Sequence, residues 1–168
     1  MANIDYHDLT GILEKYISEV LKTKENVVIA VTGKNGSGKS SFGRYIRKKG
    51  LGLYGRRSIA VIDENTLITD FLIFFKRKIK IVADSIDELM PFIERLPKKK
   101  IIFYITATPE RRITKADILL KFSTAEETRK QRLERRYGKY SESFQKYFYR
   151  KDTDDGRIVY TYHLDAET

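Results

Sequence analysis

The sequence predicts an α/β fold with a mostly parallel sheet, and two observations carry that prediction. Short apolar runs of strand length alternate with longer segments of helical periodicity, a pattern typical of a parallel sheet covered by helices. A glycine-rich loop lies where the first apolar run meets a helical segment. The chain has 168 residues, of which 41% are hydrophobic, so we expect a single domain over residues 1–168 with a substantial core.

The first third of the chain predicts two helices and two strands. Residues 5–23 repeat apolar side chains at intervals of three and four, which gives one apolar helical face. Residues 26–32 form a nearly continuous apolar run, as in a strand buried on both faces. Residues 39–49 resume a helical pattern and end in basic residues and Gly50, a common helix stop. Residues 58–62 are the second strand.

The middle of the chain predicts two further helices and another long strand. We expect a helix over 65–77 with its large apolar side chains facing inward: Leu67, Phe71, Phe74 and Phe75. A short strand at 79–83 is an additional candidate. Asp84 or Ser85 is suited to cap a helix over 86–96. The apolar run at 101–106 is the third long strand.

The last third of the chain predicts a strand, two helices and a final strand, in that order. The strands are 116–123 and 158–164, and the helices are 125–137, rich in Arg and Glu, and about 141–149. With the three earlier strands, this gives a mostly parallel five-stranded sheet. We find no internal repeat and no linker, and we distinguish an N-terminal helical segment, 1–24, within the single domain.

Composition restricts the classes of function. The chain contains 33 Lys and Arg residues and 23 Asp and Glu residues. The resulting net charge of +10 favours anionic partners such as nucleotides, nucleic acid or an acidic membrane surface. The absence of cysteine excludes disulfides, thiolate nucleophiles and cysteine-ligated metals, and His7 and His163 match no zinc spacing. Because we find neither a signal peptide nor a run of about 20 apolar residues, we expect a cytoplasmic protein without a membrane partner.

The segment from Gly33 to Ser40, GKNGSGKS, matches the pattern G-x-x-x-x-G-K-[ST]. Glycines let successive backbone N–H groups point at phosphate oxygens, and the following helix presents its positive dipole end to the same anion. Lys39 is expected to reach the β- and γ-phosphates of ATP, and Ser40 to ligate Mg²⁺. The alternative is a glycine turn with a chance Lys-Ser, which the strand before and the helix after make less favourable. The predicted nucleotide contacts in this segment are Gly33, Asn35, Gly36, Ser37, Gly38, Lys39, Ser40 and Ser41.

This segment resembles the phosphate loop of P-loop NTPases, which implies their three-layer fold. Arg129, Arg132 and Arg136 recur at spacings of three and four on a helix that follows a strand. The stretch 124–136 resembles the lid of P-loop kinases such as the uridine, cytidylate and dephospho-CoA kinases. The resemblance implies a lid-like helical region at 125–150, a nucleotide contact by Arg129, and catalytic roles for Arg132 and Arg136.

A solvated helix explains the same arginines, since three acidic residues lie at pairing distance along it: Glu126, Glu127 and Glu134. The tail, residues 150–155 and 158–168, is similar to the end of cytidylate-kinase-like proteins, although a polar loop before an edge strand explains it equally well.

Asp63 ends the second predicted strand, at the edge of the sheet that holds the phosphate loop. In kinases similar to uridine kinase an Asp at this place accepts the proton of the substrate hydroxyl and supports Mg²⁺. The resemblance therefore implies that Asp63 is catalytic and metal-binding, with Glu64 as the alternative. A helix cap by Asp63 or Asn65 is the structural alternative.

The chain departs from the family pattern after the third long strand, where P-loop enzymes usually carry an acid. Here the strand runs into Thr106, Thr108 and, further on, Glu110. Either Asp63 performs both tasks, or Asp84 contributes, or catalysis is weak or lost. Arg111 and Arg112 follow, and they are either ligands of an acceptor phosphate or surface charges.

The expected function is therefore an ATP-dependent phosphotransferase that uses Mg²⁺ and acts on a small-molecule acceptor, such as a nucleoside, nucleotide or related metabolite. Two alternatives stay open: a kinase or ATPase directed at nucleic acid, and a non-catalytic regulatory domain that binds nucleotide. The sequence identifies neither the acceptor nor the oligomeric state, because residues 64–99, which set specificity in such kinases, match least.

Overall fold

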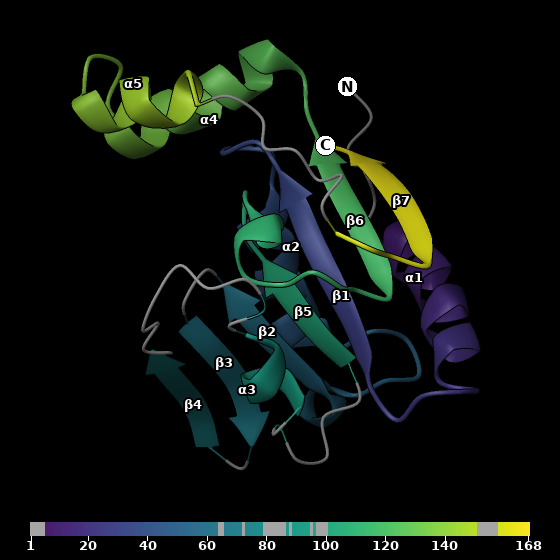
Figure 1. Cartoon of the computed structure of the whole chain (residues 1–168). Helices are drawn as coiled ribbons and strands as arrows, with labels where there is room; N and C mark the ends of the chain where they lie inside the picture. Colours follow the sequence, from purple (N-terminus) through teal and green to yellow (C-terminus); the bar gives the residue numbers. More distant parts are fainter. Residues whose placement is uncertain are drawn as a thin grey trace.

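The fold is built on one twisted sheet with helices on both faces, shown by a computed structural model (Figure 1). The structure describes residues 6–63, 66–71, 73–78, 87, 89–94, 96, 101–150 and 158–168, with the backbone alone for 67–71 and 73–78. The described strands are β1 (Val27–Gly33), β2 (Ile59–Asp63), β3 (Thr66–Phe71), β4 (Ile73–Lys78), β5 (Ile101–Ile105), β6 (Ile118–Ser123) and β7 (Tyr162–Glu167). The described helices are α1 (Tyr6–Val20), α2 (Lys39–Lys49), α3 (Met90–Glu94), α4 (Glu126–Tyr137) and α5 (Glu142–Phe148), with short 3₁₀ turns η1 (Arg56–Ser58) and η2 (Pro109–Arg111).

The strand order in the described part of the chain is β4-β3-β2-β5-β1-β6-β7. The neighbours from β2 to β7 are parallel, whereas β3 pairs with β2, and β4 with β3, in antiparallel fashion. The predicted α/β fold with five mostly parallel strands is therefore confirmed. An antiparallel pair of strands extends it beyond β2.

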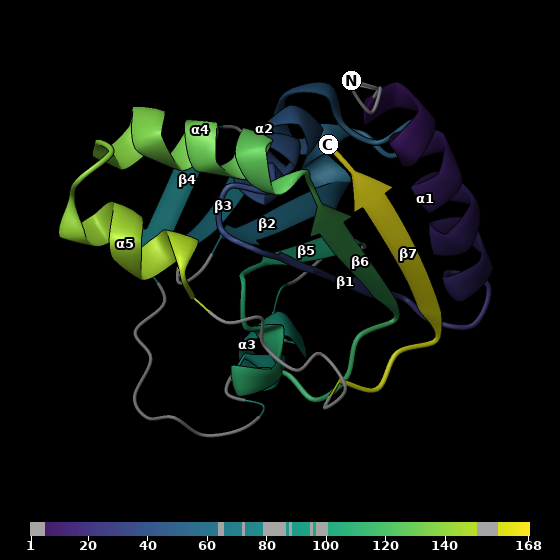
Figure 2. The same cartoon turned by 90° about the horizontal axis from the view of Figure 1, so that it is seen from above.

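Helices cover the two faces of the sheet because the central strands are apolar on both sides. Figure 2 shows α1 and α2 on one face and α3 on the other. On the first face, Phe42 and Ile46 of α2 pack in one buried cluster with the odd-numbered residues of β1, such as Ile29. On the second face, Leu89 and Ile93 share a cluster with the even-numbered residues of the same strand. Alternation along one strand thus supplies both cores.

The helix predicted over 65–77 is wrong, because these residues contribute β3 and β4. Thr66 pairs with Asp63 across the turn that leaves β2, and Phe71 pairs with Ile73 where the chain reverses again. The apolar positions of this segment fit a helical period and a strand equally well, so local pattern does not separate the two. The strand conformation is favoured because the free edge of β2 offers hydrogen-bonding partners to β3.

Other predicted boundaries move by several residues. The helix predicted over 86–96 is described only as α3, from Met90, and the strand predicted over 158–164 begins later, with β7 at Tyr162. Val159 instead makes an isolated bridge with Lys115. The predicted strand at 79–83, the helix caps Asp84 and Ser85, and residues 151–157 of the predicted tail lie outside the described residues.

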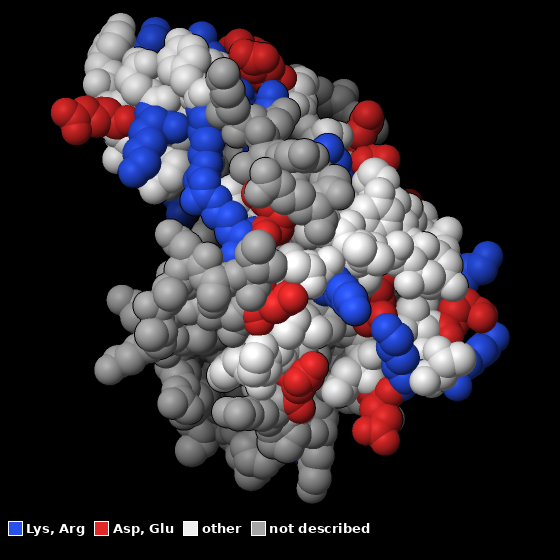
Figure 3. Space-filling view, in the orientation of Figure 1, with Lys and Arg blue, Asp and Glu red and all other residues white. Residues whose placement is uncertain are grey.

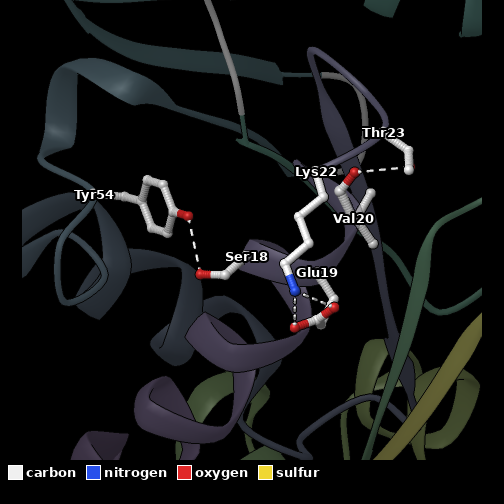
Figure 4. Close-up of polar contacts among 6 residues, drawn as sticks. All are labelled: Ser18, Glu19, Val20, Lys22, Thr23 and Tyr54. Atoms are coloured by element: carbon white, nitrogen blue, oxygen red, sulfur yellow. Dashed lines mark hydrogen bonds and ion pairs between the residues drawn. The ribbon is translucent and has the colours of Figure 1, made fainter.

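The N-terminal helix α1 is fastened to the turn that follows α2. The hydroxyls of Ser18 and Tyr54 lie 3.2 Å apart, and the Leu53 amide donates to Glu14 Oε1 at 2.5 Å. Figure 4 shows the Ser18 contact, together with an ion pair between Lys22 and Glu19 near the helix end. These contacts hold α1 against the sheet. Within the described residues, no helix is long and apolar enough to cross a membrane.

Candidate nucleotide-binding site

The phosphate loop lies at the carboxyl edge of the sheet, where the chain leaves neighbouring strands toward opposite faces. β1 continues into α2, whose side chains join the core on one face. Its neighbour β5 continues through η2 to Ile113, which joins the core on the other face. In open α/β sheets, ligands usually bind at such a divergence, beyond the carboxyl ends of the strands.

The loop between β1 and α2 has a backbone that only glycine adopts readily. Gly36 and Gly38 have φ angles of 87° and 97°. Ser41 N and Phe42 N donate to Gly38 O at 2.9 and 3.0 Å, so the helix starts directly after this residue. The N-terminus of this eleven-residue helix, with the positive end of its dipole, therefore lies at the loop, where it favours an anion. This geometry fits a phosphate group.

Lys39 is folded back along the loop. Its side chain is buried, at 7% exposure, and its Nζ donates to Gly33 O and, at 2.9 Å, to Lys34 O. Ser37 is also buried, and among the described residues its hydroxyl finds no hydrogen-bond partner. A buried cation and a buried hydroxyl within one loop are an arrangement that an anion would complete.

The remaining predicted loop residues are more open to solvent. Asn35 and Ser40 are half-buried, and Ser41 is exposed, with its hydroxyl accepting from Arg44 Nη2 at 3.2 Å. Ser40 stands in the first turn of α2, next to Lys39. Among the described residues, no three His, Cys, Asp or Glu side chains gather to hold a metal. Mg²⁺ needs no such group, because it commonly binds one or two protein oxygens together with substrate phosphates.

Asp63 lies at the same edge of the sheet as the loop. It pairs with Ile105 of β5, and Ile105 pairs in turn with Val31 of β1. Two strand spacings therefore separate the backbones of Asp63 and Val31, roughly 10 Å. Asp63 is half-buried, so its side chain is partly exposed to solvent.

The residues that follow β5 offer hydroxyls and a guanidinium. Thr106 is buried, and its hydroxyl accepts from Thr108 N at 3.3 Å. Arg111 is exposed, whereas Arg112 is half-buried, and its Nη1 atom is buried without a partner among the described residues. Of the two arginines singled out in the sequence, only Arg112 therefore has an unsatisfied buried donor.

The lid-like segment packs directly on the phosphate loop. A Cβ at Gly36 would lie 3.0 Å from Arg129 Cγ and 3.2 Å from Leu133 Cγ, so α4 approaches the loop as closely as glycine allows. In Figure 1, α4 starts at the end of β6, and α4 and α5 extend away from the sheet. Leu133, Phe144 and Phe148 form the small core that joins these two helices.

The three lid arginines point to different partners. Arg129 is buried, and its Nη1 donates to Phe148 O at 3.1 Å with the guanidinium 4.4 Å from the centre of the Phe148 ring. Arg132 donates from Nη1 to Gly36 O at 3.3 Å. Arg136 is exposed and lies over the Tyr137 ring. A nucleotide contact by Arg129, and catalytic roles for Arg132 and Arg136, stay predictions.

Two residues at this site were missed in the sequence. Tyr6 of α1 packs on Phe42, and burial raises its pKa above the usual value, while Arg132 and Arg44 nearby act in the opposite direction. Thr168, at the end of β7, donates from its hydroxyl to Ser37 O at 2.8 Å. Tyr6 lies 27 positions before Gly33 and Thr168 lies 128 positions after Ser40, so neither is local to the loop in sequence.

We expect Arg129 mainly to stabilise the packing of α5 against α4, through its contacts with Phe148. Arg129→Met keeps the aliphatic stem beneath Gly36 but removes the guanidinium, so stability should fall by about 2 kcal/mol through the lost cation–π contact and charged hydrogen bond. Urea unfolding measures this change. Arg135→Met, an exposed position of the same helix, is the control. An unchanged stability with a large loss of MgATP affinity would instead assign Arg129 to the nucleotide.

A comparison with protein families agrees with this geometry. The model of the family described as "AAA domain" matches residues 29–152, from β1 through the lid-like helices, which is most of the chain. This chain belongs to the AAA domain family. The family is one of P-loop NTPases and includes nucleotide kinases. Neither the curated proteins nor the solved structures gave a match.

Family membership shows the general function of the chain, which is a P-loop nucleotide-binding domain. The segment from Gly33 to Ser40, with its G-x-x-x-x-G-K-[ST] pattern, lies within the matched region and is the candidate phosphate loop. The match spans the strand before this loop, the loop itself and the helices that pack on it. It leaves the substrate of this AAA domain undetermined, since the family contains both kinases and ATPases.

Proposed function

We propose that this AAA domain transfers the γ-phosphoryl group of ATP to a hydroxyl or phosphate of a small-molecule acceptor, such as a nucleoside, nucleotide or related metabolite. One observation supports the proposal: the phosphate loop, a carboxylate and a guanidinium group with an unsatisfied donor each come at or after the end of one of three neighbouring parallel strands. These are the loop after β1, Asp63 on β2 and Arg112 after β5.

Each group supplies a part of phosphoryl transfer. Lys39 would neutralise charge on the β- and γ-phosphates, and Ser40 and Asp63 would hold Mg²⁺, which would supply further positive charge to the phosphates. The acceptor oxygen forms a bond to the γ-phosphorus while the bond to the bridging oxygen of ADP breaks. The proton of an acceptor hydroxyl passes to the Asp63 carboxylate. Catalysis is mainly positioning and charge neutralisation.

Arg112 supports an acceptor that carries a phosphate. Its buried Nη1 donor lacks a partner among the described residues, and an unsatisfied guanidinium donor gains strongly from a phosphate oxygen. The η2 turn that precedes Arg112 packs against β1, the strand that leads into the loop. A nucleotide or a phosphorylated metabolite would satisfy this donor, whereas an uncharged nucleoside would leave it unpaired.

The test is transfer from γ-labelled ATP with Mg²⁺ to four separate acceptor pools: nucleosides, nucleoside monophosphates, coenzyme precursors and 5′-hydroxyl oligonucleotides. We expect label in the monophosphate or coenzyme-precursor pool. Asp63→Asn keeps the shape of the side chain but replaces the proton-accepting carboxylate with a neutral amide, so the transfer rate should fall by about a hundredfold. Asp165→Asn, at an exposed carboxylate on β7, is the control.

A nucleic-acid acceptor is the second candidate, and the surface of the lid favours it. Tyr140 and Tyr149 are 86% and 69% exposed, and Lys139 lies over the Tyr140 ring. Exposed aromatics among cations stack on unpaired bases and attract the backbone. Figure 3 shows Lys and Arg atoms gathered over α4 and α5 and continuing toward the middle of this face. Label in the oligonucleotide pool would establish this candidate.

The third reading, a regulatory domain without catalysis, predicts a different result. Residues 106–110 carry two threonines and a glutamate where the family usually has an acid directly after the strand. Tight MgATP binding with no label in any of the four pools would support it. The same result would remove the phosphotransferase proposal.

A further inference from the structure

Thr168, the residue that follows β7, is hydrogen-bonded to the phosphate loop. Thr168 Oγ1 donates to Ser37 O at 2.8 Å, a much shorter contact than its alternative acceptor, Ser123 O, at 3.4 Å. The backbone of Thr168 is itself fixed, because its N–H donates to Ser123 O at 2.9 Å and its carbonyl accepts from the Thr124 hydroxyl. A hydroxyl on a fixed backbone therefore holds one particular carbonyl of the loop.

Arg132 extends this contact to the lid. Its Nη1 atom donates to Thr168 Oγ1 at 3.2 Å and to Gly36 O at 3.3 Å. A hydroxyl can accept one hydrogen bond and donate another, so a chain runs from Arg132 through Thr168 to Ser37. The positive charge at its start polarises the hydroxyl and strengthens the bond to the loop. Helix α4, strand β7 and the phosphate loop are connected through one oxygen atom.

The bond to Ser37 O also determines where the next amide points. The carbonyl of Ser37 and the N–H of Gly38 belong to one planar trans peptide, so they point in opposite directions. Glycine tolerates either sign of φ, and this peptide would otherwise rotate at low cost. With Thr168 holding the carbonyl, the Gly38 N–H points away from Thr168 and its direction is fixed. Backbone amides held in a defined direction are the groups with which such a loop binds an anion.

We propose that Thr168 is a positioning residue for nucleotide binding, which locks the Ser37–Gly38 peptide with its N–H toward the phosphates and transmits the position of α4 to the loop through Arg132. The proposal rests on nucleotide binding by the phosphate loop and not on the transfer reaction. Preorganised donors bind an anion more tightly because no reorganisation opposes binding. The lid and the loop thus respond to nucleotide as one unit.

Thr168→Val tests the hydroxyl at constant shape. MgATP titrated calorimetrically into the full chain should bind the valine variant about tenfold more weakly, the effect of one hydrogen bond with a charged donor behind it. Thr168→Ser should restore affinity to within about threefold of wild type, since it keeps the oxygen. Thr161→Val, an exposed threonine just before β7, should bind MgATP as wild type does. Equal affinity of Thr168→Val and wild type, or equal losses in the valine and serine variants, would overturn the proposal.

Two readouts separate positioning from simple packing. The Gly38 amide should exchange with solvent deuterons differently in Thr168→Val without any nucleotide, whereas a packing defect alone leaves this amide as in wild type. Arg132→Met combined with Thr168→Val should weaken MgATP binding by less than the product of the single effects, because both act through one chain. Fully multiplicative effects would contradict that chain. If wild type itself binds no MgATP, nucleotide binding fails, while the Gly38 exchange still decides the role of Thr168.

Discussion

Lys39→Ala is expected to lower kcat/KM for phosphoryl transfer by about a hundredfold or more with the fold intact. The Nζ atom lies inside the loop, where it donates to Gly33 O and Lys34 O in place of an anion. At 7% exposure this cation is poorly screened by water, so its attraction for phosphate oxygens is strong. Alanine removes that charge at the place where negative charge develops.

The matched control for this variant is Lys48→Ala on the exposed face of the same helix. It lowers the net charge of the chain equally, so general attraction of ATP to a basic protein is identical in the two variants. Rates and MgATP affinities measured side by side then isolate the contribution of position. If Lys39→Ala transfers phosphoryl groups within threefold of Lys48→Ala, Lys39 has no part in the reaction.

The secondary structure around the predicted phosphate loop was predicted correctly from the local sequence. The buried run 26–32, the glycines after it and Lys39 determine a strand, a tight loop and a helix start within about fifteen residues, and each follows from backbone sterics or burial. Asp63 was predicted at the sheet edge for the same reason, since it directly follows an apolar strand. The structure puts it two strands from β1, in the row of Val31.

The antiparallel pair β3–β4 was not predictable from local pattern. Asp63 pairs with Thr66, and the two residues between them in the sequence, Glu64 and Asn65, lack the Asn-Gly or Asp-Gly signature of a two-residue hairpin. Without that signal, the aromatic spacing favours a helix. Only pairing with β2 decides in favour of strands, and pairing is a property of the assembled sheet.

The directions of the lid arginine side chains could also not be predicted from the sequence. Their spacing predicts a common face, yet Arg129 donates a hydrogen bond to Phe148 O, whereas Arg132 donates to Gly36 O and Thr168 Oγ1. The partners are 19, 96 and 36 positions away, respectively. A contact between the last residues of β7 and the phosphate loop has no sequence signature at all, because it joins residues 131 positions apart.

Gly33→Ala is expected to destabilise the domain by about 3 kcal/mol or more, and to lower the melting temperature by about 10 °C. Gly33 has a φ of 131°, a conformation that L-residues rarely adopt. A Cβ there would also stand 2.1 Å from the carbonyl oxygen of Phe122, its partner in the ladder between β1 and β6. Relief would require separating two central strands, since the obstacle is backbone and not a flexible side chain.

Gly11→Ala on α1 is the natural control, because nothing lies within 4 Å of its Cβ position. In a helix this change should stabilise by about 0.5–1 kcal/mol, so the two alanine variants should move the melting temperature in opposite directions. MgATP binding adds a second comparison. Gly11→Ala should leave it unchanged, whereas a surviving folded fraction of Gly33→Ala should bind weakly, since the clash with Phe122 would displace the backbone carbonyl of residue 33 to which Lys39 donates. A Gly33→Ala protein as stable as wild type would show that β1 and β6 separate at little cost. The close approach of the loop to β6 would then not be what fixes the conformation of the phosphate loop.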